Sequence, residues 1–118
     1  MGGYDAVHVD AGAMMATEIV TFAYRRGVPA PGPGGVVIDV RDFANPFRQA
    51  SGNVDRYIKT MTRNYAERMA DIRQQVQDCS GTAYIGCFGG RHRSVHVARI
   101  LGRELGIGVR HMDLGGAD

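Results

Sequence analysis

The apolar positions of the chain fall into two kinds of segment, short runs typical of strands and longer stretches with helical spacing. Strands are predicted by the runs at residues 17–24, 36–40, 82–86 and 109–114. Helices are predicted at residues 54–60, 63–78 and 94–105. In the second of these, Tyr65, Met69, Ile72 and Val76 step by four and three and form one apolar face. Thr62 is expected to cap this helix.

The alternation of strands and helices predicts the fold class. It favours a three-layer α/β domain, with a mostly parallel sheet of about four strands and helices on both faces. A length of 118 residues and 12.8 kDa suits a single domain, expected over residues 14–118. Residues 1–13 show no period and are expected to form a flexible leader, and residues 25–35, rich in proline and glycine, to form a loop.

Composition excludes several protein classes. Hydrophobic residues make up 44% and charged residues 22% of the chain, which is ordinary globular usage. No run of eighteen apolar residues and no secretory signal is visible, so we expect no membrane association. Cys79 and Cys87 are the two cysteines, too few for a disulfide scaffold, and a cytoplasmic location is expected.

The kind of charged residue is more informative about function than the net charge. The net charge of +2 is too small to indicate nucleic-acid binding by itself. Thirteen of the fourteen cationic residues are arginines, and Lys59 is the single lysine. Arginine suits phosphate and carboxylate, but GC-rich coding bias also enriches it. Only the position of an arginine therefore counts as evidence.

Polar residues follow the predicted strands. Ligands of parallel sheets bind beyond the carboxyl ends of the strands, so a site is expected where these residues meet. They are Arg25, Arg26, Asp39, Arg41, Asp42, the segment 87–94, His111 and Asp113.

The strongest local motif is the loop made of Cys87, Phe88, Gly89, Gly90, Arg91, His92, Arg93 and Ser94. Its two glycines allow a tight turn before the next helix, so its amides are expected to form an anion cradle. The Arg93 guanidinium is expected to fold over the anion, with Arg91 or His92 adding charge. Ser94 either caps the helix or donates its hydroxyl. The loop predicts binding of phosphate or a phosphorylated metabolite, with no cofactor.

The spacing from Cys87 to Arg93 also matches the loop of cysteine-dependent phosphatases. There a thiolate attacks phosphorus, and Asp39 or Asp42 would protonate the leaving oxygen. The alternative is that Cys87 is a small buried apolar residue at a strand end.

Some of the remaining candidate residues have two possible interpretations, and others have no functional interpretation. Asp39 and Arg41 either contact a ligand or form an ion pair that holds the loop. His111 is either a ligand at the sheet edge or a strand residue, and His96 is interpreted as structural or exposed. Two cysteines and four scattered histidines lack metal-ligand spacing, and no Gly-Lys-Ser/Thr nucleotide loop is present.

Four motifs in order resemble the C-terminal domain of the RapZ family of RNase adaptor proteins. The loop Gly-Cys-Phe-Gly-Gly-Arg-His-Arg-Ser, residues 86–94, is similar to the family's Gly-Cys-Thr-Gly-Gly-Lys/Arg-His-Arg-Ser. The other three motifs are Phe22 to Pro29, Val37 to Pro46 and Arg110 to Leu114. The resemblance covers about residues 17–114.

The resemblance implies an α/β phosphosugar-binding domain that senses glucosamine-6-phosphate and binds small regulatory RNAs. The implied pocket residues are Asp39, Arg41, Asn45, Cys87, Gly89, Gly90, His92, Arg93 and His111. An RNA surface is expected from Arg25, Arg26, Arg91, Arg99, Arg103 and Arg110 gathered on one face.

The chain departs from the family pattern at several points. The family's N-terminal nucleotide-binding domain is not matched, so its nucleotide hydrolysis is not implied here. Gly115 to Asp118 stand where the family has a basic tail, which weakens the RNA expectation. Phe88 stands where Thr is usual, which removes a hydroxyl beside the cradle and alters the choice of ligand, and Ala44 replaces a proline.

Overall fold

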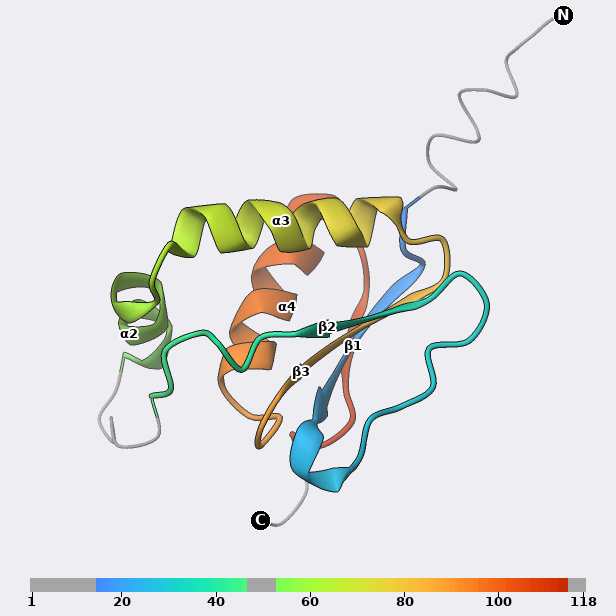
Figure 1. The fold of residues 1–118 in the computed structure, drawn as a ribbon. Helices are drawn as coiled ribbons and strands as arrows, with labels where there is room; N and C mark the ends of the chain where they lie inside the picture. Colours follow the sequence, from blue (N-terminus) through green and yellow to red (C-terminus); the bar gives the residue numbers. More distant parts are fainter. Residues whose placement is uncertain (1–14, 47–52, 115–118) are drawn as a thin grey trace, which may run out of the picture.

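The computed structural model describes residues 15–46 and 53–114, and it confirms the α/β class. The leader predicted for residues 1–13 lies outside the described residues. The strands are β1 (Glu18–Ala23), β2 (Val36–Asp39), β3 (Thr82–Cys87) and β4 (Val109–His111). They form one sheet in the order β2-β3-β1-β4, and each neighbouring pair is parallel (Figure 1).

The helices lie close to their predicted positions. The described helices are η1 (Tyr24–Arg26, a 3-10 turn), α2 (Val54–Met61), α3 (Tyr65–Asp78) and α4 (Arg93–Leu105). The prediction that Thr62 caps α3 is wrong, because α3 begins after Asn64, whose φ of 55° is left-handed. The Thr62 hydroxyl instead accepts a hydrogen bond from the Ala44 amide at 2.9 Å. This bond ties the end of α2 to the segment after β2.

The main core lies between the sheet and the helices. Strand positions with the same orientation are brought together by the register, which pairs Ile19 with Ala83 and Ile38 with Ile85. These four residues belong to one buried cluster with helix residues, which include Ile72 and Val76 of α3 and Val97, Ala98 and Leu101 of α4. The apolar face predicted for α3 is therefore a core face.

The two faces of the sheet are covered unequally. The connections through α2–α3 and through α4 both advance in the same direction along the sheet, from β2 to β3 and from β3 to β4. Right-handed crossovers in one direction place their helices on one face, and α3 and α4 accordingly share one core cluster. The connection from β1 to β2 runs back and contains only η1.

The other face of the sheet carries an aromatic cluster. The Phe22 ring lies 4.8 Å from the Tyr24 ring and 6.5 Å from the Tyr84 ring, measured between centroids. Gly86 makes room for Phe22, since a Cβ there would lie 2.3 Å from Phe22 Cζ. Aromatic packing therefore takes the place of a long helix on this side.

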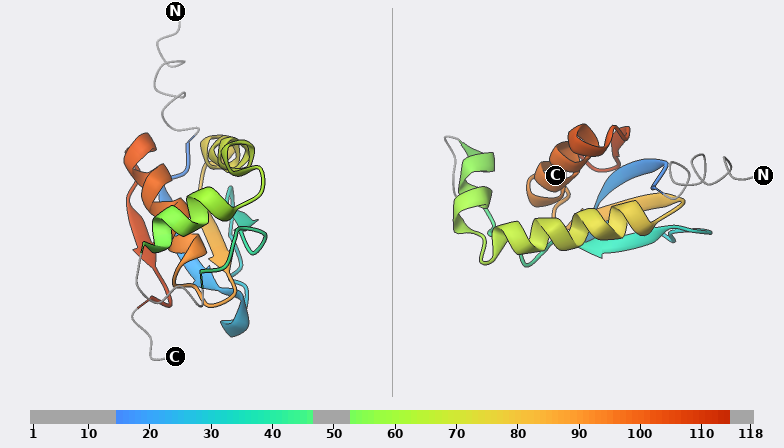
Figure 2. Two further views of the ribbon diagram at one scale, coloured as in Figure 1. Left: turned by 90° about the vertical axis from the view of Figure 1, so that its left-hand side faces the viewer. Right: turned by 90° about the horizontal axis from the view of Figure 1, so that it is seen from above.

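Helix α2 lies at one end of the molecule, beside the starts of α3 and α4 (Figure 2). None of the helices in the described part of the chain is both long and apolar enough to span a bilayer. The loops after β1, β2 and β3 all leave from the C-terminal ends of their strands (Figure 1). The candidate site lies at this end of the sheet.

Candidate functional site

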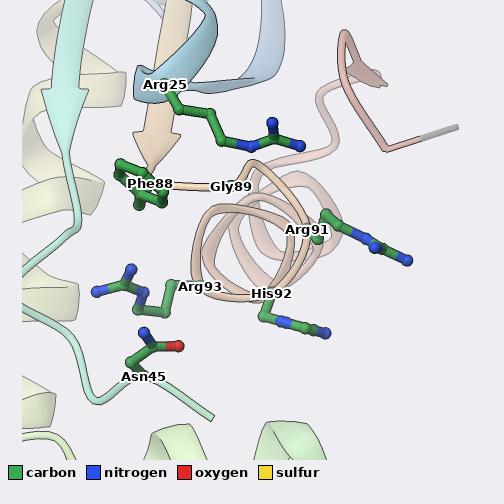
Figure 3. Close-up of a pocket in the computed structure, with 7 residues that line it drawn as sticks. All are labelled: Arg25, Asn45, Phe88, Gly89, Arg91, His92 and Arg93. Carbon is green, nitrogen blue, oxygen red and sulfur yellow. The ribbon is translucent and has the colours of Figure 1, made fainter. Parts of the chain in front are cut away.

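The carboxyl ends of the parallel strands meet around one pocket. The register ends with Ala23 beside Cys87 and with Asp39 beside Gly86, so the three following loops converge. The pocket has a volume of about 390 Å³. Its lining residues come from all three loops and are Arg25, Asn45, Phe88, Gly89, Arg91, His92 and Arg93 (Figure 3). We call it the loop pocket.

The loop after β3 can turn tightly because of Gly90. This residue has a φ of 70°, a conformation that residues with a side chain rarely adopt. A Cβ at Gly90 would also lie 3.0 Å from both the Cβ and the amide nitrogen of Ala23. The Arg25 amide donates a hydrogen bond to the Phe88 carbonyl at 3.1 Å and joins the loop to η1. The backbone of the loop is thus held against the end of β1 and η1 before α4 begins at Arg93.

Cys87 is the last residue of β3, directly before this loop, and is only 2% exposed. Its Sγ is 3.3 Å from the Ser94 Oγ. Burial acts to raise the pKa of the Cys87 thiol, but hydrogen bonds from the Ser94 hydroxyl and from the amides of Ser94, Gly90 and His92 together lower it. These groups around the Cys87 sulfur favour its thiolate form. The use of the loop as a phosphate cradle stays a prediction. The N-cap of α4 is His92, so Ser94 is not the cap residue, and its hydroxyl oxygen accepts from the Cys87 thiol. Donation by this hydroxyl to a ligand stays a prediction.

Arg93 lines the pocket and also hydrogen-bonds to the backbone of the segment after β2. Its Nη1 donates hydrogen bonds to the carbonyls of Arg41 at 2.6 Å and Phe43 at 3.3 Å, and the residue is 8% exposed. In Figure 3 its guanidinium extends toward the segment after β2, whereas Arg91 and His92 extend to the other side. Part of the hydrogen-bonding capacity of Arg93, which was expected to bind an anion, is thus used by these carbonyls. Through them Arg93 holds the loop after β2 against the start of α4.

Arg91 and His92 form the outer part of the pocket lining together with Phe88. The pKa of the His92 imidazole is lowered by burial and by the neighbouring charges of Arg91 and Arg93, which favours its neutral form. The Phe88 side chain is 57% exposed. No acidic residue is among the described residues that line the pocket.

Asp39 and Arg41 form the ion pair that was one of their two interpretations. Arg41 Nη2 lies 2.7 Å from Asp39 Oδ2, and Arg41 Nε lies 3.0 Å from Asp39 Oδ1. The Arg41 guanidinium carbon also lies 3.8 Å from the centroid of the Tyr24 ring. The hydrogen bonds from Arg41 hold the pKa of the Asp39 carboxyl below its usual range. A carboxyl that stays ionised is poorly suited to protonate a leaving group.

Asp42, the other candidate acid, is also paired. Arg68 of α3 donates to its carboxylate from Nε at 2.7 Å and from Nη2 at 3.0 Å. Both candidate carboxylates therefore hold the β2 loop in place through arginines.

His111, the last residue of β4, and Asp113, which follows it, both contact β1. The His111 Nδ1 lies 2.8 Å from the Thr21 hydroxyl, and Asp113 accepts a hydrogen bond from the Ala23 amide at 2.8 Å. Burial, and secondarily the charge of Arg99, lowers the pKa of His111. Neither residue lines the loop pocket. Their contacts fasten β4 to β1.

The arginines expected to form an RNA surface occupy several surroundings. Arg25 and Arg91 line the loop pocket, whereas Arg99 and Arg103 line a second cavity of about 410 Å³ between α2 and α4. Arg110 pairs with Glu18 at 3.1 Å. Their use by RNA stays a prediction. Within residues 15–46 and 53–114, no group of three or more His, Cys, Asp or Glu side chains is placed to hold a metal ion.

Two features were missed at the level of the sequence. Arg25 was assigned to the sheet edge but not to the pocket, although its position directly after a strand was a usable signal. His96 is 3% exposed and hydrogen-bonds Tyr65 at 2.7 Å and Asp55 at 2.8 Å. No local pattern signals this contact, because its members are 41 and 31 residues away from His96.

Comparisons with known proteins give one family and a consistent set of relatives. The family described as the RapZ C-terminal domain matches residues 15–114. A "Nucleotide-binding protein" of Carboxydothermus hydrogenoformans is 33% identical over 122 residues, which is 85% of this chain and 42% of that protein. One of Marinobacter nauticus is 31% identical over 85% of this chain and 41% of its own length. The chain spans about two fifths of the length of these curated relatives.

Proposed function

Because the chain belongs to the RapZ C-terminal domain family, we propose that it is a regulatory binding domain whose loop pocket takes a small phosphorylated metabolite. The match confirms the resemblance identified from the four sequence motifs. The family resemblance implies a sugar phosphate, with glucosamine-6-phosphate as the named example. The nucleotide binding in the names of the relatives belongs to proteins more than twice as long, so for this chain it is only a candidate activity.

The observation that carries the proposal is the concentration of donors around one pocket. Arg25 and Arg91 bring guanidinium groups, and the loop brings the backbone of Gly89 and Arg91 just before α4 begins. A phosphate dianion favours such a site because helix N-termini and arginines both stabilise negative charge. Among the residues that the structure describes, none of those lining the pocket brings a carboxylate to oppose this charge.

The test is a binding titration with inorganic phosphate and a panel of phosphorylated metabolites, followed by thermal shift or calorimetry. We expect Arg91→Ala to weaken phosphate binding by about tenfold, since one charge-assisted contact contributes about 1.5–3 kcal/mol. Arg103→Ala is the matched control, because it removes the same charge from α4 outside the loop pocket. If no phosphorylated compound binds, or if both variants lose affinity equally, the proposal is wrong. Arg93→Ala is less informative, because Arg93 also supports the fold.

A cysteine-dependent phosphatase is the second candidate, and the observation in its favour is the set of loop hydrogen bonds around the Cys87 sulfur, which lower the pKa of its thiol. In this reaction Sγ attacks phosphorus as the ester oxygen leaves with a proton from water, and a second water then releases phosphate from sulfur. The paired state of Asp39 and Asp42 leaves neither of these two carboxyls ready to serve as the acid. Turnover of an aryl phosphate that is lost in Cys87→Ser but kept in Cys79→Ser would support it, and the absence of turnover would exclude it.

A further inference from the structure

The cavity between α2 and α4 is separate from the loop pocket. It has a volume of about 410 Å³, and the two helices that form it are in contact (Figure 2). No described residue lines both cavities. A volume of this size is typical of small-molecule sites. We call it the helix cavity.

Two cationic side chains from each helix line the helix cavity. Arg56 and Lys59 share one face of α2, because they are three residues apart. Arg99 and Arg103 share one face of α4, because they are four residues apart. All four residues are exposed. Like charges at such spacings repel each other, so this cluster does not serve to stabilise the helices.

These four cations have no counter-ion within the fold. Their side chains form no hydrogen bond or ion pair with any other part of the chain that the structure describes. Arg68 of α3, in contrast, is paired with the carboxylates of Asp42 and Asp71. The donors at the helix cavity are therefore free to contact a ligand, and a bound anion would relieve their mutual repulsion.

One carboxylate also lines the helix cavity. Asp55 Oδ1 lies 2.8 Å from Nδ1 of the buried His96, so part of its hydrogen-bonding capacity is already used. The cations outnumber this carboxylate among the described lining residues. The cavity therefore carries an excess of positive charge and favours a ligand with several negative charges.

The division of the cations between two helices favours linked phosphates over a single phosphate. Each phosphate group offers several acceptor oxygens, and one arginine binds two of them at once. A single phosphate satisfies one or two such donors, whereas a chain of phosphates presents oxygens to both helices.

We propose that the helix cavity binds a small oligophosphate, whose phosphate groups are contacted by two cations from α2 and two from α4. This site goes beyond the proposed function and does not depend on it, because the helix cavity and the loop pocket have no described lining residue in common.

The test uses inorganic tripolyphosphate, followed by NMR through the backbone amide signals of isotope-labelled protein at physiological ionic strength. Signals of α2 and α4 report on the helix cavity, and signals of the loop after β3 report on the loop pocket. We expect the α2 and α4 signals to titrate at about tenfold lower concentrations of tripolyphosphate than of orthophosphate, because the longer anion adds a charge-assisted contact. The absence of a response in α2 and α4, or an equal response to both anions, would overturn the inference. Failure of phosphate compounds to shift the loop signals would instead count against the proposed function alone.

Substitutions on both helices locate the binding. Arg56→Gln and Arg99→Gln should each weaken tripolyphosphate binding at the helix cavity by about threefold to fivefold, the effect of one exposed ion pair. Arg63→Gln is the matched control, because it removes the same charge from an exposed position outside the cavity. We expect the control to change the affinity by less than about twofold, since salt screens distant charges. Equal losses in all three variants would show general charge attraction and overturn the site.

Asp55→Asn should have the opposite effect. It removes the one opposing charge and keeps an oxygen near His96, so we expect tripolyphosphate to bind about twofold to fivefold more tightly. Weaker binding would contradict the proposed position of the anion.

A short single-stranded RNA tests the other source of linked phosphates. We expect it to shift the α2 and α4 signals only at higher phosphate concentrations than tripolyphosphate does, because a small cavity admits a compact anion better than a polymer. A response to RNA at lower concentrations would show a nucleic-acid surface and overturn the proposal of a small-ligand site.

Discussion

At the scale of single residues, the loop after β3 depends on backbone geometry more than on any one charge. Gly90 allows the turn, and the amides of Gly90, His92 and Ser94 then lie around the Cys87 sulfur. The neighbouring arginines act on the outside of this frame. A change that disturbs the turn should therefore affect the cradle more than the loss of one side chain does.

We expect Gly90→Ala to reduce the free energy of unfolding by about 1–3 kcal/mol, because it forces a left-handed conformation on alanine and crowds Ala23. Gly89→Ala is the matched control, since no atom outside its chain neighbours lies within 4 Å of its added Cβ. We expect the control to change stability by less than about 0.5 kcal/mol. Urea unfolding measures both variants, and equal losses would show that the turn does not need glycine at position 90.

At the scale of elements, one buried imidazole joins three helices. His96 of α4 contacts the Tyr65 hydroxyl of α3 at 2.7 Å and the Asp55 carboxylate of α2 at 2.8 Å. The His96 amide also donates to the carbonyl of His92, the residue just before α4. The packing of α2 and α3 is thereby connected to the first turn of α4, which follows the loop after β3.

We expect Tyr65→Phe to destabilise the protein by about 1–3 kcal/mol, because it leaves the buried His96 ring nitrogen without its partner. Tyr57→Phe removes the same hydroxyl from a half-buried position on α2 and should cost less than about 0.5 kcal/mol. Thermal or urea unfolding compares the two variants. Similar losses would mean that the His96 contact contributes nothing of its own.

At the scale of the whole molecule, ion pairs join distant segments of the chain. Arg68 joins α3 to Asp42 after β2, Arg73 joins α3 to Glu104 of α4, and Arg110 joins β4 to Glu18 of β1. Most of these side chains are partly exposed, so salt screens their contribution. The apolar core, rather than these pairs, is therefore the main source of stability.

Acid should remove the contribution of the Asp39–Arg41 pair. Arg41 lowers the pKa of the Asp39 carboxyl in the folded protein. The pair therefore stabilises the fold fully above the pKa that Asp39 has in the unfolded chain, about 4. This stabilisation is lost as the pH falls through the pKa that Asp39 has in the folded protein. We expect Asp39→Asn to lose less stability than the unaltered protein between pH 6 and pH 3. Arg41→Gln should have the same effect from the other side of the pair. Identical acid profiles for all three proteins would contradict this.

The sequence by itself determined the secondary structure, the parallel α/β class, the family and the loop from Cys87 to Ser94. These follow from local periodicity and from residues adjacent in the chain, because helix and strand repeats arise from short-range backbone geometry. The ends of elements were less predictable. Thr62 lies where a cap is expected, but its hydroxyl bonds to Ala44.

Only the tertiary structure decided which partner each polar group takes. Arg93 reaches carbonyls 52 and 50 residues away, and Asp42 pairs with Arg68, which is 26 residues away in the chain. The placement of α3 and α4 on one face of the sheet likewise depends on strand order. Such choices are made among many chemically equivalent groups, and only the folding of distant segments into contact determines which group lies within hydrogen-bonding distance.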